Sequence, residues 1–223
     1  SERLIISDLD NFAQKHNGDI IPIMKNLTLD YNKVTSIAIA GNSGSGKSYA
    51  LTYFLSHLKQ ISELIIIDPK FDTPSRWARE NNIAIIHPQK NRSKSDFVSE
   101  INENLSASLN IIQQRQEILF DNPKHQFEHL TIVIDEVLAL SEGVNKTIKE
   151  SFFSLLSQIA LLGRATKIHL FLVSQRFDHN SIPISVREQL NVLIQIGNIN
   201  KKTISILFPA LNSGNGDCIP YRK

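Results

Sequence analysis

Residues 41–48 read Gly-Asn-Ser-Gly-Ser-Gly-Lys-Ser, which is the pattern of a phosphate-binding loop. An apolar run at 35–40 precedes the octet and a helix-like segment at 47–59 follows it, so the motif stands in the strand–loop–helix context that it requires. The glycines let successive backbone N–H groups point inward at phosphates, and the start of the helix adds attraction for anions. The sequence therefore predicts a nucleoside triphosphate site.

Two side chains of this loop have specific expected roles. Lys47 is expected to reach the phosphate oxygens, and the Ser48 hydroxyl is expected to ligate Mg²⁺. The alternative is a glycine- and serine-rich turn that merely contains a lysine, and the flanking strand and helix argue against it. The predicted nucleotide-binding residues are Gly41, Asn42, Ser43, Gly44, Ser45, Gly46, Lys47, Ser48 and Tyr49.

A pair of acids, Asp135 and Glu136, ends the apolar run that begins at residue 129. An acid at such a strand end can hold the Mg²⁺ shell, which makes Asp135 the second predicted metal ligand beside Ser48. An adjacent glutamate can orient and deprotonate the attacking water, so Glu136 is the predicted general base. The pair favours hydrolysis over simple nucleotide binding. Two solvated acids that begin a loop are the plainer alternative.

A third strand-like run, 168–174, is followed by Gln175 and Arg176. A polar side chain at the tip of a strand beside the acidic one can touch the γ-phosphate or the lytic water and so report hydrolysis to the rest of the molecule. Gln175 is the predicted sensor, grouped with Lys47 and Glu136 as a catalytic residue. A polar loop start without nucleotide contact is the alternative.

The fold class predicted from the pattern is α/β. Short Ile- and Val-rich runs alternate with longer segments of helical periodicity, which is typical of βα units and a mainly parallel sheet with helices on both faces. We assign residues 35–223 to this domain and residues 1–34 to an N-terminal segment with an edge β-ribbon at 20–24 and 27–29. Strands are predicted at 35–40, 64–68, 83–87, 131–135, 168–174 and 192–196, and helices at 47–59, 75–81, 96–120, 146–162 and 201–207.

Bulk composition narrows the class of protein. The chain has 223 residues, a net charge of +2 and 41% hydrophobic residues, which is ordinary for a globular protein. No apolar run is long enough to span a membrane, so no membrane contact is expected within this chain, although an anchor outside it stays open. The single cysteine, Cys218, excludes an internal disulfide and fits a reducing cytoplasm.

Several segments together resemble the FtsK/SpoIIIE branch of the FtsK–HerA DNA-translocating ATPases. The resemblance extends over about residues 35 to 220. The order and spacing of the segments agree with those of the family, as do the individual motifs. Phe177 departs from it, because the family often has proline there. The segments are Leu64-Ile-Ile-Ile-Asp-Pro-Lys70, Asp135-Glu136 with Val137–Leu140, Gly163-Arg-Ala-Thr-Lys-Ile-His-Leu170 running into Ser174-Gln-Arg176, Asn191–Ile196, and Gly216-Asp217.

The resemblance implies a RecA-like P-loop NTPase motor domain with ATP and Mg²⁺ as cofactors. It also implies a homo-oligomeric ring, usually hexameric, around double-stranded DNA. ATP would lie between neighbouring subunits, with an arginine finger from one subunit reaching the phosphates bound to the next. Arg164 is the first finger candidate and Arg115, midway along the long helix, is the second. A surface charge near a helix end is the plainer reading of Arg164.

The expected biological setting rests on family knowledge. The sequence ends at Lys223 without the C-terminal winged-helix module that reads orientation sequences in chromosomal translocases. We therefore expect the motor of a plasmid, phage or integrative element, acting in transfer, replication or packaging with partner proteins of that process.

Contact with DNA is expected through phosphates and without sequence preference. The best local basic cluster is formed by Lys90, Arg92 and Lys94, and a second is formed by Lys201 and Lys202. Each also reads as an ordinary solvated surface. Aromatic residues are not interleaved with these clusters, so base stacking on single strands is unsupported.

Two further functions stay open. One is a ring ATPase that acts on single-stranded nucleic acid or on protein. The other is a nucleotide-dependent switch or scaffold that moves nothing, against which the Asp135–Glu136 pair argues. A GTPase is disfavoured because the guanine-reading pattern Asn-Lys-x-Asp is absent: Asn145-Lys146 is followed by Thr147-Ile148.

Overall fold

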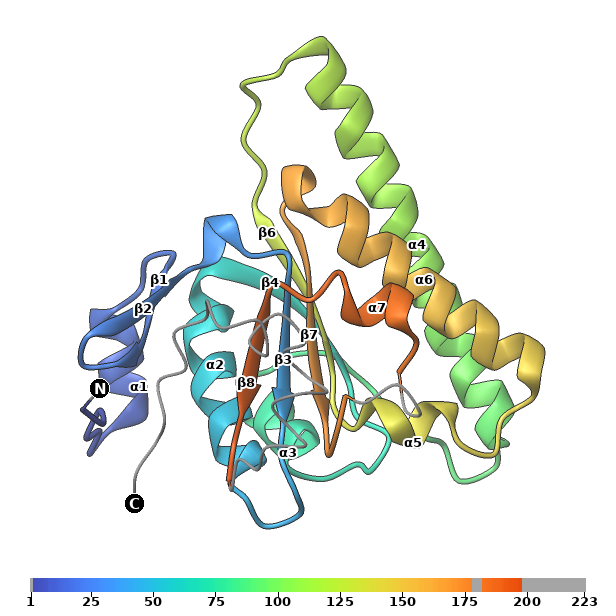
Figure 1. Ribbon diagram of the computed structural model, residues 1–223, viewed down its shortest axis with the longest axis horizontal. Helices are drawn as coiled ribbons and strands as arrows, with labels where there is room; N and C mark the ends of the chain where they lie inside the picture. The colour runs from blue at the N-terminus through green and yellow to red at the C-terminus, as the bar shows by residue number, and fades with distance from the viewer. Residues whose placement is uncertain (1, 178–181, 198–223) are drawn as a thin grey trace, which may run out of the picture.

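The computed structural model describes residues 2–177 and 182–197, in which a six-stranded parallel sheet lies between two layers of helices (Figure 1). The strand order is β5-β4-β6-β7-β3-β8, and the five neighbouring pairs are all parallel. The predicted α/β class is confirmed, and each predicted strand is present. The strands are β3 (Ser36–Ala40), β4 (Ser62–Ile67), β5 (Ile85–Ile86), β6 (His129–Ile134), β7 (Ile168–Ser174) and β8 (Val192–Gln195).

Three central strands, β3, β6 and β7, are buried along their whole length. Their continuous apolar runs follow from this position, because helices cover both faces of the sheet and leave no solvent-facing side. β5 is shorter than the predicted 83–87 and spans two residues at one edge.

The helices divide into two layers (Figure 1). α2 (Lys47–Ile61) and α3 (Thr73–Glu80) pack on one face around Phe54, Leu55, Trp77 and their neighbours. The opposite face is covered by α4 (Lys94–Asp121), α5 (Val137–Ser141), α6 (Lys146–Thr166) and α7 (Ile184–Arg187). The predicted helix 201–207 lies outside the described residues.

The N-terminal segment corrects one expectation. The ribbon forms from β1 (Ile20–Met24) and β2 (Leu27–Asp30), but the two strands make a separate antiparallel sheet and do not extend the edge of the parallel one. A helix that periodicity did not predict, α1 (Leu9–Lys15), precedes the ribbon and packs against α2. The Asp8 side chain accepts a hydrogen bond from the Asn11 N–H, which caps α1.

Buried aromatic and imidazole side chains join this segment to the sheet. Tyr31, in the 3₁₀ turn Tyr31–Lys33, stacks on His169 with ring centroids 4.2 Å apart and hydrogen-bonds Thr131 at 2.6 Å. His129 bridges His169 at 2.8 Å and Asp19 at 3.4 Å. These residues lie where β6 and β7 begin, at the amino edge of the sheet.

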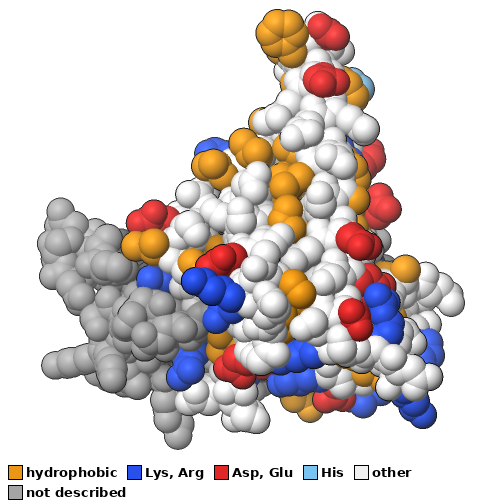
Figure 2. Space-filling model, turned by 90° about the vertical axis from the view of Figure 1, so that its right-hand side faces the viewer, with side chains coloured by type: hydrophobic (Ala, Val, Ile, Leu, Met, Phe, Trp, Pro, Cys, Tyr) orange, Lys and Arg blue, Asp and Glu red, His pale blue; other side chains and the backbone are white. Residues whose placement is uncertain are grey.

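Helix α4 is longer than the layer it belongs to. Its first turn is fixed by a capping box, in which Ser93 and Asp96 each bond the backbone N–H of the other. Its buried side chains end at Ile112, and the remaining turns project beyond the body with Ile118 and Phe120 exposed (Figures 1 and 2). In the described part of the chain, neither α4 nor any other helix is long and apolar enough to cross a membrane.

Candidate nucleotide site

The predicted site residues meet at the carboxyl edge of the parallel sheet. The loop after β3, the acids after β6 and Gln175 after β7 follow three consecutive strands of the order β6-β7-β3. Ligands of open parallel sheets bind outside the carboxyl ends of the strands for this topological reason. Residues far apart in the sequence are thus brought to one place.

The backbone of the loop at 41–48 has the curvature that the motif predicts. Gly44 and Gly46 adopt positive φ angles of 75° and 101°, which side-chain-bearing residues rarely adopt. Gly41 is required for a different reason: a Cβ there would lie 2.5 Å from Ser45 Oγ and 2.7 Å from the Ile196 carbonyl oxygen. Helix α2 then begins at Lys47 without a side-chain cap, so its first N–H groups remain directed at the loop.

Lys47 is folded back onto its own loop. Its ammonium donates to the carbonyl oxygens of Gly41 at 2.5 Å and Asn42 at 3.0 Å. Burial lowers the pKa of Lys47, and the carboxylates of Glu136 and Asp135 oppose that shift. The electrostatic influence of both acids places them within reach of the Lys47 charge.

Asp135 stands directly after β6, where its N–H donates to the Ile67 carbonyl oxygen at 3.0 Å. Burial, followed by the charges of Asp68 and Glu136, raises the pKa of Asp135 to about 6. Concentrated negative charge in a partly buried place is what a divalent cation would relieve. Hydroxyl and carboxylate oxygens, such as those of Ser48 and Asp135, are the ligand type that Mg²⁺ prefers, so the two predicted metal ligands stay a prediction consistent with this chemistry.

Glu136 is buried, with 6% of its surface exposed, and its carboxylate is paired with a lysine. Oε2 of Glu136 lies 3.0 Å from Nζ of Lys70, which follows the neighbouring strand β4. Glu136 also adopts a left-handed conformation, with φ 51° and ψ 64°, at a cost of about 1–3 kcal/mol for a non-glycine residue. This backbone turn starts α5 and directs the acid back toward the strand ends.

Lys70 is held by a loop that is organised around the buried carboxylate of Asp68. Asp68 accepts hydrogen bonds from the backbone N–H groups of Lys70, Phe71, Asp72 and Ser75 and from the Ser75 hydroxyl, at 2.6–3.2 Å. Sequence reasoning noted Asp-Pro-Lys only as part of a resemblance and gave neither acid nor lysine a role. A strand ending in a charged pair beside the predicted acids was the available signal.

Gln175 lies at the tip of β7, between the P-loop strand and the acidic strand, with an exposed side chain. The preceding residue, Ser174, accepts a hydrogen bond from the Gly41 N–H through its carbonyl oxygen at 3.3 Å. The Ser174 hydroxyl is buried and has no protein partner among the described residues. The end of β7 therefore touches the start of the phosphate-binding loop through the Ser174 backbone, and the sensor role of Gln175 stays a prediction.

The two finger candidates lie at the opposite, amino edge of the sheet. Arg164 is exposed in the last turn of α6, just before β7 begins. Arg115 donates to the carbonyl oxygens of Glu128 at 2.9 Å and Thr166 at 2.7 Å, and its guanidinium lies 4.9 Å from the Phe127 ring. Arg115 therefore ties α4 to the chain around β6 and α6, whereas Arg164 faces solvent.

The expected DNA-binding cluster is partly engaged within the chain. Arg92 forms an ion pair with Glu100 at 2.5 Å, and the Lys94 ammonium donates to the Glu142 carbonyl oxygen. Lys90 is exposed on the loop between β5 and α4. Lys201 and Lys202 lie outside the described residues.

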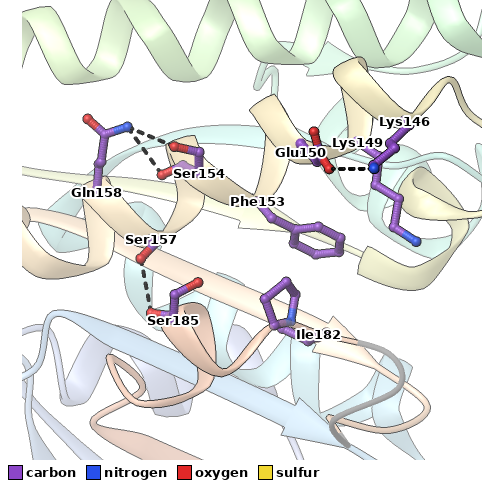
Figure 3. A pocket seen from close by; sticks show the side chains of 10 residues that line it. Lys146, Lys149, Glu150, Phe153, Ser154, Ser157, Gln158, Ile182 and Ser185 are labelled. Atoms are coloured by element: carbon purple, nitrogen blue, oxygen red, sulfur yellow. Dashed lines mark hydrogen bonds and ion pairs between the residues drawn. The ribbon is translucent and has the colours of Figure 1, made fainter.

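A cavity of about 730 Å³ lies elsewhere, between α6 and the segment 182–185 (Figure 3). Phe153 and Ile182 both line it, the Ser157 hydroxyl donates to the Ser185 carbonyl oxygen at 3.0 Å, and Lys146 pairs with Glu150. None of its lining residues belongs to the loop 41–48 or to the strand ends that carry the acids. This cavity is separate from the predicted nucleotide site.

Comparison with known proteins assigns the chain to a family. Residues 32–182, well over half of the sequence, match the AAA domain family. The chain belongs to this family. The FtsK domain-containing protein YdcQ of Bacillus subtilis (strain 168) is 22% identical over 203 residues, which cover 88% of this chain and 41% of YdcQ. The resemblance to the FtsK branch is thereby confirmed.

Solved structures share the fold of this AAA domain. The pCW3 conjugation coupling protein TcpA superposes with a TM-score of 0.65 at 21% identity, covering 94% of this chain and 62% of TcpA. EssC (ATPases 2 and 3) from Geobacillus thermodenitrificans gives a TM-score of 0.66 at 14% identity, covering 86% and 39%. The chain spans less than two thirds of the length of YdcQ and of either structure.

Proposed function

We propose that this AAA domain is an ATP-hydrolysing motor that moves double-stranded DNA as a ring oligomer, in the service of a plasmid, phage or integrative element. The observation that carries the proposal is the convergence of three features at one sheet edge: the phosphate-binding loop, the Asp135–Glu136 pair and Gln175.

The described side chains can divide the work of hydrolysis. Lys47 would exchange its two loop carbonyls for phosphate oxygens, which are stronger, charged acceptors. Glu136 would accept the proton of the attacking water, and its burial keeps the carboxylate away from bulk solvent. Gln175 would orient that water or the γ-phosphate from the tip of β7.

Ser48 and Asp135 would hold the metal ion that accompanies ATP. Mg²⁺, when bound, neutralises charge on the β- and γ-phosphate oxygens. The raised pKa of Asp135 fits this role, because the repulsion by Asp68 and Glu136 that raises it would be offset by a cation. An arginine from a neighbouring subunit, with Arg164 as first candidate, would supply further positive charge.

Double-stranded DNA is proposed as the track because two similar proteins point to it. YdcQ carries an FtsK domain, and TcpA is named as a conjugation coupling protein. Lys90, Arg92 and Lys94 are all exposed, but Arg92 and Lys94 are engaged within the chain, so a strong grip would need several subunits to contribute together.

A second candidate is a motor that acts on protein. It is favoured by the likeness of fold to EssC and to EccC of Thermomonospora curvata, which is named as a type VII secretion ATPase (TM-score 0.58, 19% identity, covering 82% of this chain and 24% of EccC). The low net charge of +2 fits this candidate as well, since it predicts no strong attraction for nucleic acid.

The deciding experiment measures ATP turnover against added double-stranded DNA, with single-stranded DNA and protein alone as controls. Stimulation by duplex that is lost at high salt supports a motor gripping phosphates. If duplex DNA does not change turnover at concentrations where sedimentation shows a ring, the result supports a motor that acts on protein. No turnover at all, with nucleotide bound, supports a switch or scaffold.

A further inference from the structure

Lys70 is a charged side chain at the nucleotide edge to which the predicted site assigned no role. Half of its side-chain surface is exposed, yet its ammonium is fixed 3.0 Å from the buried Glu136 carboxylate. We infer that Lys70 binds the γ-phosphate of the nucleotide, and that its pairing with Glu136 is the resting position that it leaves when a triphosphate arrives. The inference rests on the proposed function and deepens it.

The first argument is the parallel with Lys47. Each lysine donates to oxygen acceptors of the protein itself: Lys47 to the carbonyls of Gly41 and Asn42, and Lys70 to Glu136. Lys47 must exchange its acceptors for phosphate oxygens when the loop is filled. Lys70 faces the same exchange, because it is bound to the acid that must be free to accept a proton from water.

The second argument is proximity. The Lys70 ammonium lies 3.0 Å from the carboxylate of Glu136, the residue that follows Asp135, because β4 and β6 are neighbouring strands. Lys70 therefore belongs to the group of charges at this edge of the sheet, and its charge lowers the pKa of Lys47 as well. A half-exposed lysine with four rotatable methylenes can move between two such acceptors at small cost.

The third argument is the rigidity of its base. Five hydrogen bonds to Asp68 hold the turn from which Lys70 projects. The next residue, Phe71, is kept at a φ of 53° and stacks on His87 with centroids 4.1 Å apart. Because the backbone of this turn is already fixed, only the flexible Lys70 side chain has to move. The ammonium group can then be positioned without ordering a loop at each turnover.

The consequence is a preference for triphosphate over diphosphate. ADP lacks the group that would compete with Glu136 for the ammonium, so Lys70 stays on Glu136 in the ADP state. ATP draws Lys70 away and frees the base. A ligand shifts such an equilibrium only through its different affinity for the two positions, and the γ-phosphate supplies that difference.

The test compares the dissociation constants of ADP and ATPγS, both with Mg²⁺, for the wild-type chain and for Lys70→Met, with Lys124→Met, at an exposed lysine after α4, as a matched control. We expect Lys70→Met to weaken ATPγS about tenfold while ADP changes less than about twofold, as for loss of one charge-assisted hydrogen bond. Lys70→Arg should recover most of the preference, and Lys124→Met should behave as wild type.

A double-mutant cycle gives an independent readout. Glu136→Gln should strengthen ATPγS binding more in the wild-type background than with Lys70→Met, because only the former contains the competing pair. Equal ATPγS-to-ADP ratios in wild type and Lys70→Met, or equal weakening of both nucleotides, would overturn the inference and leave Lys70 as a structural partner of Glu136. Absence of nucleotide binding by the wild-type chain would instead overturn the proposed function.

Discussion

A Cβ atom placed on Gly163 would lie 2.1 Å from the carbonyl oxygen of Ile168. The end of α6 thus approaches the start of β7 too closely for any side chain. Gly163→Ala should force the two apart and destabilise the protein by about 1–3 kcal/mol, measured by urea unfolding. Gly18→Ala, where a Cβ meets nothing within 4 Å, is the control. Equal stability of Gly163→Ala and wild type would contradict the close approach.

Lys47→Ala should weaken ATP binding about 10- to 100-fold. The variant lacks the ammonium group that, in the wild type, would leave the carbonyl oxygens of the loop and bind phosphate oxygens. Titration calorimetry with ATPγS and Mg²⁺ measures the change. Lys59→Ala removes an ammonium from the same helix, α2, away from the loop, and should bind as wild type. Unchanged affinity in Lys47→Ala would remove the loop from the nucleotide site.

Glu136→Gln should retain nucleotide and reduce turnover about 100- to 10,000-fold, as expected for loss of a general base. A coupled phosphate-release assay under saturating ATP is the measurement. Glu142→Gln changes an exposed glutamate six residues further on and serves as control. Turnover near the wild-type rate in Glu136→Gln would refute the assigned role.

Arg164→Ala should lower turnover about 1000-fold if its guanidinium serves a neighbouring site, and mixing should reveal it. Arg164→Ala subunits keep their loop and Lys47→Ala subunits keep their arginine, so a mixture should regain turnover that neither variant has alone. Arg115→Ala should behave differently. It loses two backbone contacts, so it should unfold more readily, and mixing should not compensate. Absence of rescue for Arg164→Ala would reject it as the finger.

The buried imidazole of His169 should make the fold sensitive to acid. Burial, then the charge of His129, lowers the pKa of His169 from 6.5 to about 3. Between pH 6.5 and 3, His169 is therefore protonated in the unfolded chain and neutral in the folded chain. The free energy of unfolding should fall as pH decreases through this range, by up to about 1.4 kcal/mol per pH unit. His169→Phe should flatten urea-unfolding stability across that range, whereas His125→Gln should keep the slope. An unchanged slope in His169→Phe would contradict the effect.

The sequence predicted the parallel sheet well because strand burial leaves a direct trace in continuous apolar runs. The phosphate-binding loop and the acids after β6 could be predicted equally well, since each needs particular residue types at fixed spacing. Tertiary partners left no such trace. Nothing local indicates that Lys70 meets Glu136, because this contact depends on β4 lying beside β6, which spacing along the chain does not reveal. The bonds from four backbone N–H groups to Asp68 are local, but they depend on the conformation of the turn after β4, which the residue types alone do not specify.

The N-terminal segment shows the same limit. A ribbon was expected from the apolar runs at 20–24 and 27–29 and is present, but it is separate from the parallel sheet and packs on α2, where the Tyr53 hydroxyl donates to the Pro22 carbonyl oxygen. The short helix α1 carries only one fully buried residue, Ala13, so its periodicity was too weak to read.

The opposite placement of Lys47 and Arg164 has a consequence for assembly. The phosphate-binding loop opens at the carboxyl edge of the sheet and Arg164 at the amino edge, so one copy cannot join the two. A two-fold dimer of antiparallel copies can pair the two edges, because an isologous contact sets residue i against residue j and residue j against residue i. A heterologous, head-to-tail contact also pairs them, and it either closes by rotation or continues as a filament. A parallel contact that sets each edge beside the same edge of its neighbour leaves every loop without a foreign arginine, so the common direction of the strands limits which assemblies can share a site.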